Sequence, residues 1–271
     1  MDWRGRRRSS NIEDRRGDNI ASAGAGGALL LRFIPMLLGT RTGRWILGIG
    51  VLVVLGGKML GIDLLPLLLG GGQTVSQQSQ RPLSPAEQEL SEFVSVVLAD
   101  TETTWHQIFQ SIGRQYQEPT LVLFSNRVQS ACGTASSAVG PFYCPADGGI
   151  YLDTSFYDVM QQQLGAGGDF ARLYVVAHEY GHHIQNLTGL ASQVRSLQQR
   201  SPRDANALQV RMELQADCYA GVWAGKNSDL IERGDLEEGM EAAAAIGDDA
   251  ISERMGGRAS PESFTHGTSE Q

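Results

Sequence analysis

The chain has 271 residues, of which 22 are basic and 30 acidic, so its net charge is −8. This length fits one domain of ordinary size with appendages, and 41% hydrophobic residues exclude a wholly disordered chain. The acidic balance argues against a nucleic-acid-binding protein, and three cysteines are too few for a disulfide-built miniprotein.

The charges are unevenly distributed, with a sum of +5 over residues 1–44 and −13 over residues 45–271. Residues 45–69 form an apolar stretch in which Lys58 and Asp63 are the only charges, long enough for a transmembrane helix. Five glycines within this stretch disfavour the alternative, a buried helix of a soluble protein. We therefore predict a basic cytoplasmic tail over residues 1–44 and a membrane anchor over residues 45–69. The positive-inside rule then places the acidic residues that follow the anchor, 70–271, outside the cytoplasm.

Residues 70–83, rich in Gly, Ser and Gln, are expected to form a linker before a single domain over residues 84–271. A helix is predicted to begin after Ser84, because Pro85 and Glu87 follow at the positions of a capping box. Strands are predicted over residues 120–128 and 149–153, and helices over residues 154–164, 169–187, 204–226 and 230–255. The domain is thus predicted to be α+β, mostly helical, with a small sheet.

The helix predicted over residues 169–187 contains the sequence His178-Glu179-Tyr180-Gly181-His182. Residues four apart lie one turn above each other, so the two imidazoles can bind one zinc ion. The glutamate beside the first histidine can then take a proton from zinc-bound water and pass it to a leaving amine. This spacing is typical of zinc metalloproteases. The alternative is a helix with two surface histidines, which the apolar residues 173–177 disfavour.

A catalytic zinc requires a third protein ligand and one open position. Glu213 and Asp217 are again four apart, on the next predicted helix, and therefore share a face. One carboxylate can bind the metal, and the other can hold the N–H of a ligand histidine. The apolar residues around the pair argue against a solvated acidic face. We predict Glu213 as the metal ligand and Asp217 as the carboxylate that supports a histidine.

The sequences HEYGHHIQN and ELQADCYAGVW together resemble the gluzincin pattern, in which HExxH is followed by E-x-x-x-D. More closely, the chain resembles the bacterial membrane-anchored neutral zinc metallopeptidases of the YpfJ-like family. The segments MDWRGRRRSSNIEDRRG, GPFYCPADGGIYLD and SFTHGTSEQ fit that family too, so the resemblance covers nearly the whole chain. It implies one catalytic zinc ion held by His178, His182 and Glu213, with Glu179 as catalytic base.

The resemblance also implies a gluzincin-like fold with a small, mostly antiparallel sheet, preceded by one transmembrane helix. It implies a single-pass protein of the bacterial inner membrane, with a cytoplasmic N-terminus and a periplasmic or extracytoplasmic catalytic domain. Other membrane gluzincins carry a Thr-His pair after the E-x-x-x-D helix, and Thr265-His266 is similar. His266 would then be catalytic and donate a hydrogen bond to the tetrahedral oxyanion. The alternative is an exposed histidine near the C-terminus.

The sequence also allows predictions for the strand at residues 149–153 and for the three cysteines. Residues 149–153 are either an edge strand that pairs with an extended substrate peptide or an ordinary core strand. If the domain lies outside the cytoplasm, we expect a disulfide between Cys132 and Cys144. Cys218 then has no disulfide partner among the three cysteines.

The sequence therefore predicts a membrane-anchored zinc metalloendopeptidase that acts on a peptide or protein substrate through zinc-bound water activated by Glu179. One alternative is a membrane-tethered, non-catalytic zinc-binding or scaffold domain, whose closed site needs a fourth protein ligand such as His266. Another is a zinc hydrolase that acts on a non-peptide amide. Glu179 favours an enzyme, because a structural zinc site does not require it. The oligomeric state stays open.

Overall fold

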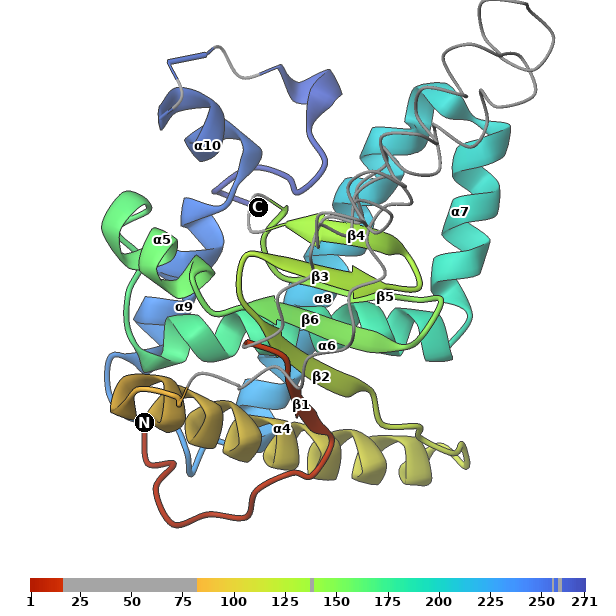
Figure 1. Ribbon diagram of the computed structural model, residues 1–271. Coiled ribbons are helices and arrows are strands. Elements are labelled where there is room, and N and C mark those ends of the chain that lie inside the picture. Colours follow the sequence, from red (N-terminus) through yellow and green to blue (C-terminus); the bar gives the residue numbers. More distant parts are fainter. Residues whose placement is uncertain (17–81, 137–138, 255, 258–259) are drawn as a thin grey trace, which may run out of the picture. The chain divides into compact units, whose positions relative to one another are not determined.

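The computed structural model of the protein describes residues 1–16, 82–136, 139–254, 256–257 and 260–271 (Figure 1). The helices of this part are α4 (Pro85–Ser111), α5 (Phe156–Gln163), α6 (Asp169–Leu187), α7 (Leu190–Arg200), α8 (Ala205–Lys226), α9 (Asp235–Ala245) and α10 (Asp248–Arg254). The strands are β1 (Ile12–Asp14), β2 (Thr120–Phe124), β3 (Arg127–Ser130), β4 (Gly133–Ser136), β5 (Phe142–Cys144) and β6 (Gly149–Asp153). The described fold is α+β and mainly helical, as predicted.

The larger sheet has the strand order β1–β2–β6–β5. Strands β1 and β6 both run parallel to β2, with Leu121 of β2 opposite Ile12 and Ile150. Only β5 is antiparallel to its neighbour, and β3 and β4 form a separate antiparallel hairpin. The prediction of a mostly antiparallel sheet is therefore wrong for the larger sheet. Parallel pairing of β2 with β6 is possible because the β3–β4 hairpin and β5 lie between them and return the chain to the same end.

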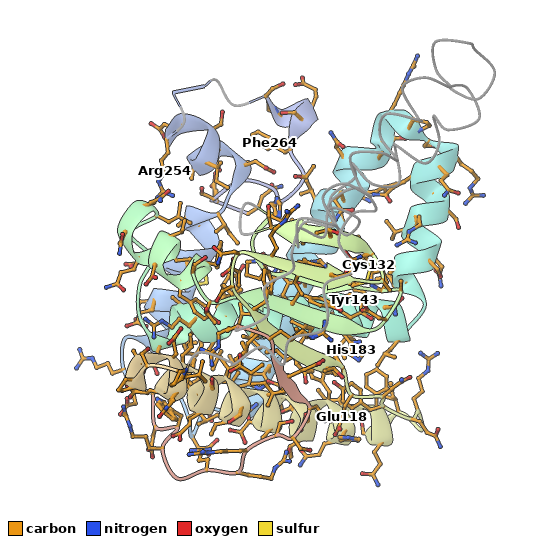
Figure 2. The ribbon with its side chains drawn as sticks, viewed as in Figure 1. Glu118, Cys132, Tyr143, His183, Arg254 and Phe264 are labelled. Atoms are coloured by element: carbon orange, nitrogen blue, oxygen red, sulfur yellow. A yellow bond between two sulfur atoms is a disulfide. The ribbon has the colours of Figure 1, made fainter. Side chains whose placement is uncertain are left out.

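Strand β6 is buried along its whole length and is paired on both sides. It is therefore a core strand, and the edge strand on this side of the sheet is β5. Tyr143 of β5 and His183 of α6 lie side by side, with 3.2 Å between the phenol oxygen and Nδ1 (Figure 2). The edge strand β5 thus lies against the helix that carries the HExxH sequence.

Helix α6 is the central element of the fold, because it contacts β5 and β6 as well as α4, α7, α8 and α9. The close approach of α8 depends on Gly181. A Cβ atom at this position would lie 2.7 Å from the Cα of Ala216 on α8, so only glycine lets the two helices meet here. Glu213 lies one turn before Ala216, and this packing brings its carboxylate to the histidines of α6.

Several predicted elements agree closely with the structure. Helix α6 and strand β6 have the predicted bounds, and Ser84 and Glu87 form the expected capping box at the start of α4. The strand predicted over residues 120–128 is instead two strands, which a turn at Asn126 separates with a left-handed φ of 69°. Helix α7 and strand β1 were not predicted.

The first residues of the chain belong to the folded body. Residues 1–17 and 81–271 form one compact unit. Trp3 is buried and packs edge-to-face on Phe93 of α4, with 5.5 Å between the ring centroids, and β1 adds a strand to the sheet. Residues 1–16 therefore pack within the same unit as the helices and the sheet.

Several arginines of residues 1–16 pair with acidic side chains that come after residue 81. The guanidinium of Arg6 lies 2.9 Å from Asp229, and that of Arg8 lies 2.9 Å from Glu92. Arg4 and Arg7 also pair with acidic residues of α4, so four arginines near the N-terminus are paired within one folded unit.

The predicted anchor and nearly all of the predicted linker lie outside the described residues. No helix of the described part is both long and apolar enough to cross a membrane. Cys132, which follows β3, and Cys144 of β5 are joined by a disulfide, the pairing expected from the sequence. Cys218 on α8 is a free, exposed cysteine.

Candidate metal centre

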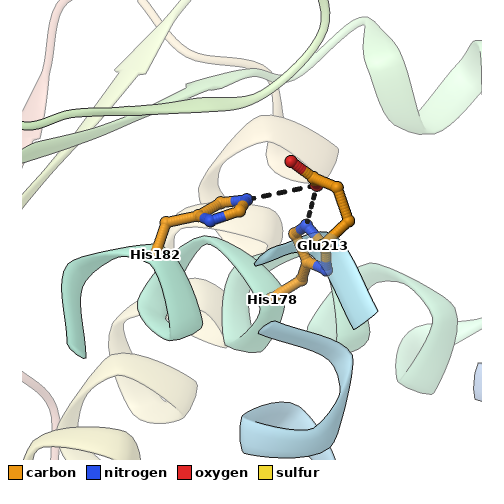
Figure 3. Close-up of side chains that lie close together, drawn as sticks. All are labelled: His178, His182 and Glu213. Atoms are coloured by element: carbon orange, nitrogen blue, oxygen red, sulfur yellow. Dashed lines mark hydrogen bonds and ion pairs between the residues drawn. The ribbon is translucent and has the colours of Figure 1, made fainter. Parts of the chain in front are cut away.

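The side chains of His178, His182 and Glu213 converge between α6 and α8 (Figure 3). Oε2 of Glu213 lies 3.2 Å from Nε2 of His178 and 3.3 Å from Nε2 of His182. One nitrogen or oxygen atom from each residue lies within 4.8 Å of the others. Two imidazole nitrogens and a carboxylate oxygen are a ligand set of catalytic zinc sites, so these residues fit the metal that the sequence predicts.

Asp217 supports the first histidine. Its Oδ1 lies 2.7 Å from Nδ1 of His178, so the ring is held with Nε2 toward Glu213. The same oxygen accepts a hydrogen bond from the hydroxyl of Tyr174 at 2.5 Å. The sequence analysis missed Tyr174, although its position one turn before His178 places it on the same helix face.

Two glutamines hold the other members of the cluster, and the sequence analysis missed both. Oε1 of Gln185 lies 3.0 Å from Nδ1 of His182, and its amide nitrogen donates to the carbonyl of Met212 at 2.7 Å. The amide of Gln209 donates to Oε1 of Glu213 at 2.6 Å. Gln185 follows His182 by three residues, and Gln209 precedes Glu213 by four. Both spacings place the glutamine on the same helix face as the residue it contacts, which the sequence could have indicated.

The pKa values of the cluster reflect these contacts. Burial opposes the charged form of His178, but hydrogen bonds with Asp217 and Glu213 raise its pKa to about 10. Burial likewise opposes the charged form of Glu213, but hydrogen bonds with both histidines hold its pKa well below the usual carboxylate range. Without a metal, these contacts thus favour the protonated form of His178 and the ionised form of Glu213.

Glu179 lies in a cleft of about 420 Å³ that His178, His182 and Glu213 also line. Its side chain is buried, and burial raises its pKa above the ordinary carboxylate value, although the two histidines counteract this shift. A carboxyl group with a raised pKa at a cleft is suited to accept a proton and return it.

His266 lines the same cleft but is not a member of the metal cluster. About half of its side chain is exposed, and Asp248 at the start of α10 holds its loop. Oδ2 of Asp248 accepts the backbone N–H groups of Thr265 at 2.7 Å, His266 at 2.6 Å and Gly267 at 2.9 Å. Gly267 has a left-handed φ of 102°, a conformation that favours glycine. The structure thus fixes the loop that brings His266 to the cleft.

Comparison with known proteins agrees with this geometry. Residues 1–271 match the family model described as "Putative neutral zinc metallopeptidase". The chain belongs to this family of zinc metallopeptidases. It is 48% identical to the uncharacterized protein YpfJ of Escherichia coli (strain K12) over 275 residues, which cover this whole chain and 92% of that relative. It is 41% identical to an uncharacterized protein of Mycobacterium tuberculosis (strain H37Rv) over 196 residues, 68% of this chain and 66% of that relative. No solved structure matches the chain significantly.

The third histidine of the HEYGHH sequence has a different environment from the first two. His183 is buried on another face of α6, where its Nε2 lies 2.7 Å from the carbonyl oxygen of Gln117. Burial lowers the pKa of His183, so the ring is neutral at neutral pH and connects α6 to the loop before β2. It stays apart from the metal cluster.

Proposed function

We propose that the protein is a zinc-dependent metalloendopeptidase. The observation that carries this proposal is that Glu179 shares one cleft with the three candidate ligands His178, His182 and Glu213. Membership of a zinc metallopeptidase family supports the same chemistry.

Glu179, His266 and the three candidate ligands each have a role in peptide hydrolysis. When bound, zinc supplies Lewis acidity that activates a water molecule and polarises the scissile carbonyl group. The carboxylate of Glu179 accepts the proton of the attacking water and delivers it to the nitrogen of the leaving amine. Asp217 and Gln185 keep the two ligand imidazoles in place. His266 donates a hydrogen bond to the carbonyl oxygen as negative charge develops there.

The number of candidate ligands argues against the alternative of a non-catalytic zinc domain. A closed structural site has four protein ligands. Within the described residues the cluster of candidate metal-ligating side chains has three members, His178, His182 and Glu213. Three ligands beside a buried glutamate support a site with an open position, which is what an enzyme needs. A hydrolase of non-peptide amides would use the same groups, so a substrate test must separate it from a peptidase.

The disulfide between Cys132 and Cys144 bears on location. Disulfides persist in oxidising compartments outside the cytoplasm. We infer that the folded unit, including residues 1–16, functions in such a compartment. Alkylation of the protein in freshly lysed cells, followed by mass spectrometry, tests this inference. Cys132 and Cys144 are expected to resist alkylation, and full alkylation of both would contradict it.

Two measurements test the proposed function: zinc binding by the purified protein and its cleavage of peptides. The purified protein is expected to bind one zinc ion, and X-ray absorption should show two imidazoles, one carboxylate and one non-protein oxygen. Peptides are expected to be cleaved internally, with activity lost on chelation and restored by zinc. A spectrum that requires four protein ligands, together with no cleavage of any peptide, would favour the non-catalytic domain. Hydrolysis of simple amides without cleavage of peptides would favour the other alternative.

A further inference from the structure

A second cavity, of about 360 Å³, adjoins the metal cluster between α6, α8 and α9. Its volume lies within the range of cavities that hold small ligands or side chains. Apolar side chains from the three helices form much of its wall: Phe170, Leu173, Ala177, Ala220, Leu236 and Met240.

This cavity shares part of its wall with the cleft of the proposed active site. His178, Glu213 and His266 line both the cavity and the cleft that contains Glu179. On α6, the cavity is lined before His178 by Phe170, Leu173, Tyr174 and Ala177, whereas Glu179 and His182 line the cleft. A peptide whose scissile bond lies at the metal cluster therefore has a neighbouring side chain at the mouth of the cavity.

The chemistry of the cavity favours an apolar occupant. The carboxylates of Glu213 and Asp217, which reach its wall, are already hydrogen-bonded within the metal cluster. On α9, Met240 is 71% exposed and Leu236 is 53% exposed. Large apolar side chains that stay exposed beside a cavity are typical of a surface that becomes covered by a ligand.

The wall opposite α6 is a fixed part of the fold. Oδ1 of Asp249 accepts the backbone N–H of Ser269 at 2.8 Å and its hydroxyl at 2.9 Å. The hydroxyl of Ser269 also donates to the carbonyl of Ala244 at the end of α9, at 2.7 Å. The segment 268–271 is thereby held against the helices, so the cavity has a defined shape.

We propose that this cavity is a specificity pocket that binds a bulky apolar side chain of the substrate, of the Leu, Met or Phe class, next to the scissile bond. This assignment rests on the proposed peptidase function and names the substrate class of that same site. Burial of such a side chain contributes binding free energy that a small residue such as Ala does not supply.

Two glycines of α8 allow a matched test. Gly221 lines the cavity, and a Cβ atom there would meet no atom within 4 Å, so a larger side chain can enter the space without displacing the fold. Gly225 lies one turn later on the same helix, is also free of neighbours within 4 Å, and is not part of the wall. Gly221→Leu therefore fills the pocket, and Gly225→Leu makes the same change outside it.

The experiment compares zinc-loaded wild type, Gly221→Leu and Gly225→Leu on a peptide library that varies the residues on both sides of the cleaved bond. Wild type is expected to cleave next to large apolar residues at least about tenfold faster than next to Ala. Gly221→Leu is expected to lose about tenfold on the large residues but not on Ala, whereas Gly225→Leu retains the wild-type profile. An absence of apolar preference in wild type, or an unchanged profile in Gly221→Leu, would overturn the proposal.

A binding measurement separates failure of this proposal from failure of the proposed function. Peptides with Leu or Ala at the preferred position are titrated into zinc-loaded Glu179→Gln, with and without Gly221→Leu. We expect tighter binding of the Leu peptide and loss of that difference when the pocket is filled. Equal binding of both peptides overturns the pocket. Leu-selective binding together with no cleavage by wild type contradicts the peptidase function and leaves the pocket as a binding site.

Discussion

Nδ1 of His178 lies 2.7 Å from Oδ1 of Asp217, and the hydroxyl of Tyr174 donates to the same oxygen at 2.5 Å. The three side chains form a chain of hydrogen bonds that ends at the candidate ligand nitrogen, Nε2 of His178. Partners of this kind fix the orientation of a ligand imidazole and raise its basicity.

Asp217→Ala is therefore expected to weaken zinc binding by about 10- to 100-fold, because the ring of His178 loses its fixed orientation. Tyr174→Phe is expected to have a smaller effect in the same direction, since it removes only the partner of Asp217. Competition with a chelator of known affinity measures both, and circular dichroism checks the fold. Unchanged zinc affinity in Asp217→Ala would show that this contact does not orient a ligand.

Gly181→Ala is expected to destabilise the protein by about 1–3 kcal/mol, because its Cβ would meet the backbone of Ala216 at 2.7 Å and push α8 from α6. Displacement of α8 also moves Glu213 away from the histidines, so zinc affinity is expected to fall. Gly221→Ala is the matched control, since a Cβ there meets nothing and helix propensity alone predicts a gain of about 0.5–1 kcal/mol. Urea denaturation gives both values, and equal stability of the two variants would contradict the close packing.

His266→Ala is expected to lower kcat by about 10²- to 10³-fold with little change in KM, as for loss of an oxyanion donor. Asp248→Ala is expected to lower kcat in the same direction, because three backbone N–H groups of the loop lose their acceptor. The double variant should be no slower than His266→Ala. Additive losses in kcat would show that Asp248 acts independently of His266.

Zinc binding to the metal-free protein is expected to release about one to two protons at pH 7. Hydrogen bonds with Asp217 and Glu213 raise the pKa of His178 to about 10, and a hydrogen bond with Glu213 raises the pKa of His182, so protons held by these rings are released when the metal binds their neutral forms. Apparent zinc affinity should therefore rise from pH 6 to pH 8. Conversely, the stability that these charged pairs give the metal-free protein is present below pH 6.5 and is lost as the pH rises through about 10. Calorimetry in buffers of different ionisation enthalpy counts the protons, and a count of zero would contradict the protonated cluster.

The sequence was most informative where spacing and chemistry coincide. The four-residue separations of His178 from His182 and of Glu213 from Asp217 identify two helix faces, and the structure brings both faces together. Neutral partners such as Gln185 were not recognisable, because their role depends on which groups the fold places beside them.

The packing of the N-terminal residues could not be predicted from the sequence. Arginines before an apolar stretch match the positive-inside pattern, and nothing in that pattern indicates that Arg6 pairs with Asp229 or Arg8 with Glu92. Strand β1 has the sequence Ile-Glu-Asp, too short and too polar for a periodicity signal, and its pairing with β2 depends on contacts far along the chain. Long-range pairing of this kind also determines the parallel register of the sheet.

The central claim is that Glu179 performs proton transfer at a zinc site built by His178, His182 and Glu213. The most direct measurement is the rate of peptide cleavage by wild type and by Glu179→Gln, each with its zinc content measured in the same sample. We predict one zinc ion in both proteins and a rate about 10²- to 10⁴-fold lower in the variant. Equal rates at equal zinc content would contradict the account.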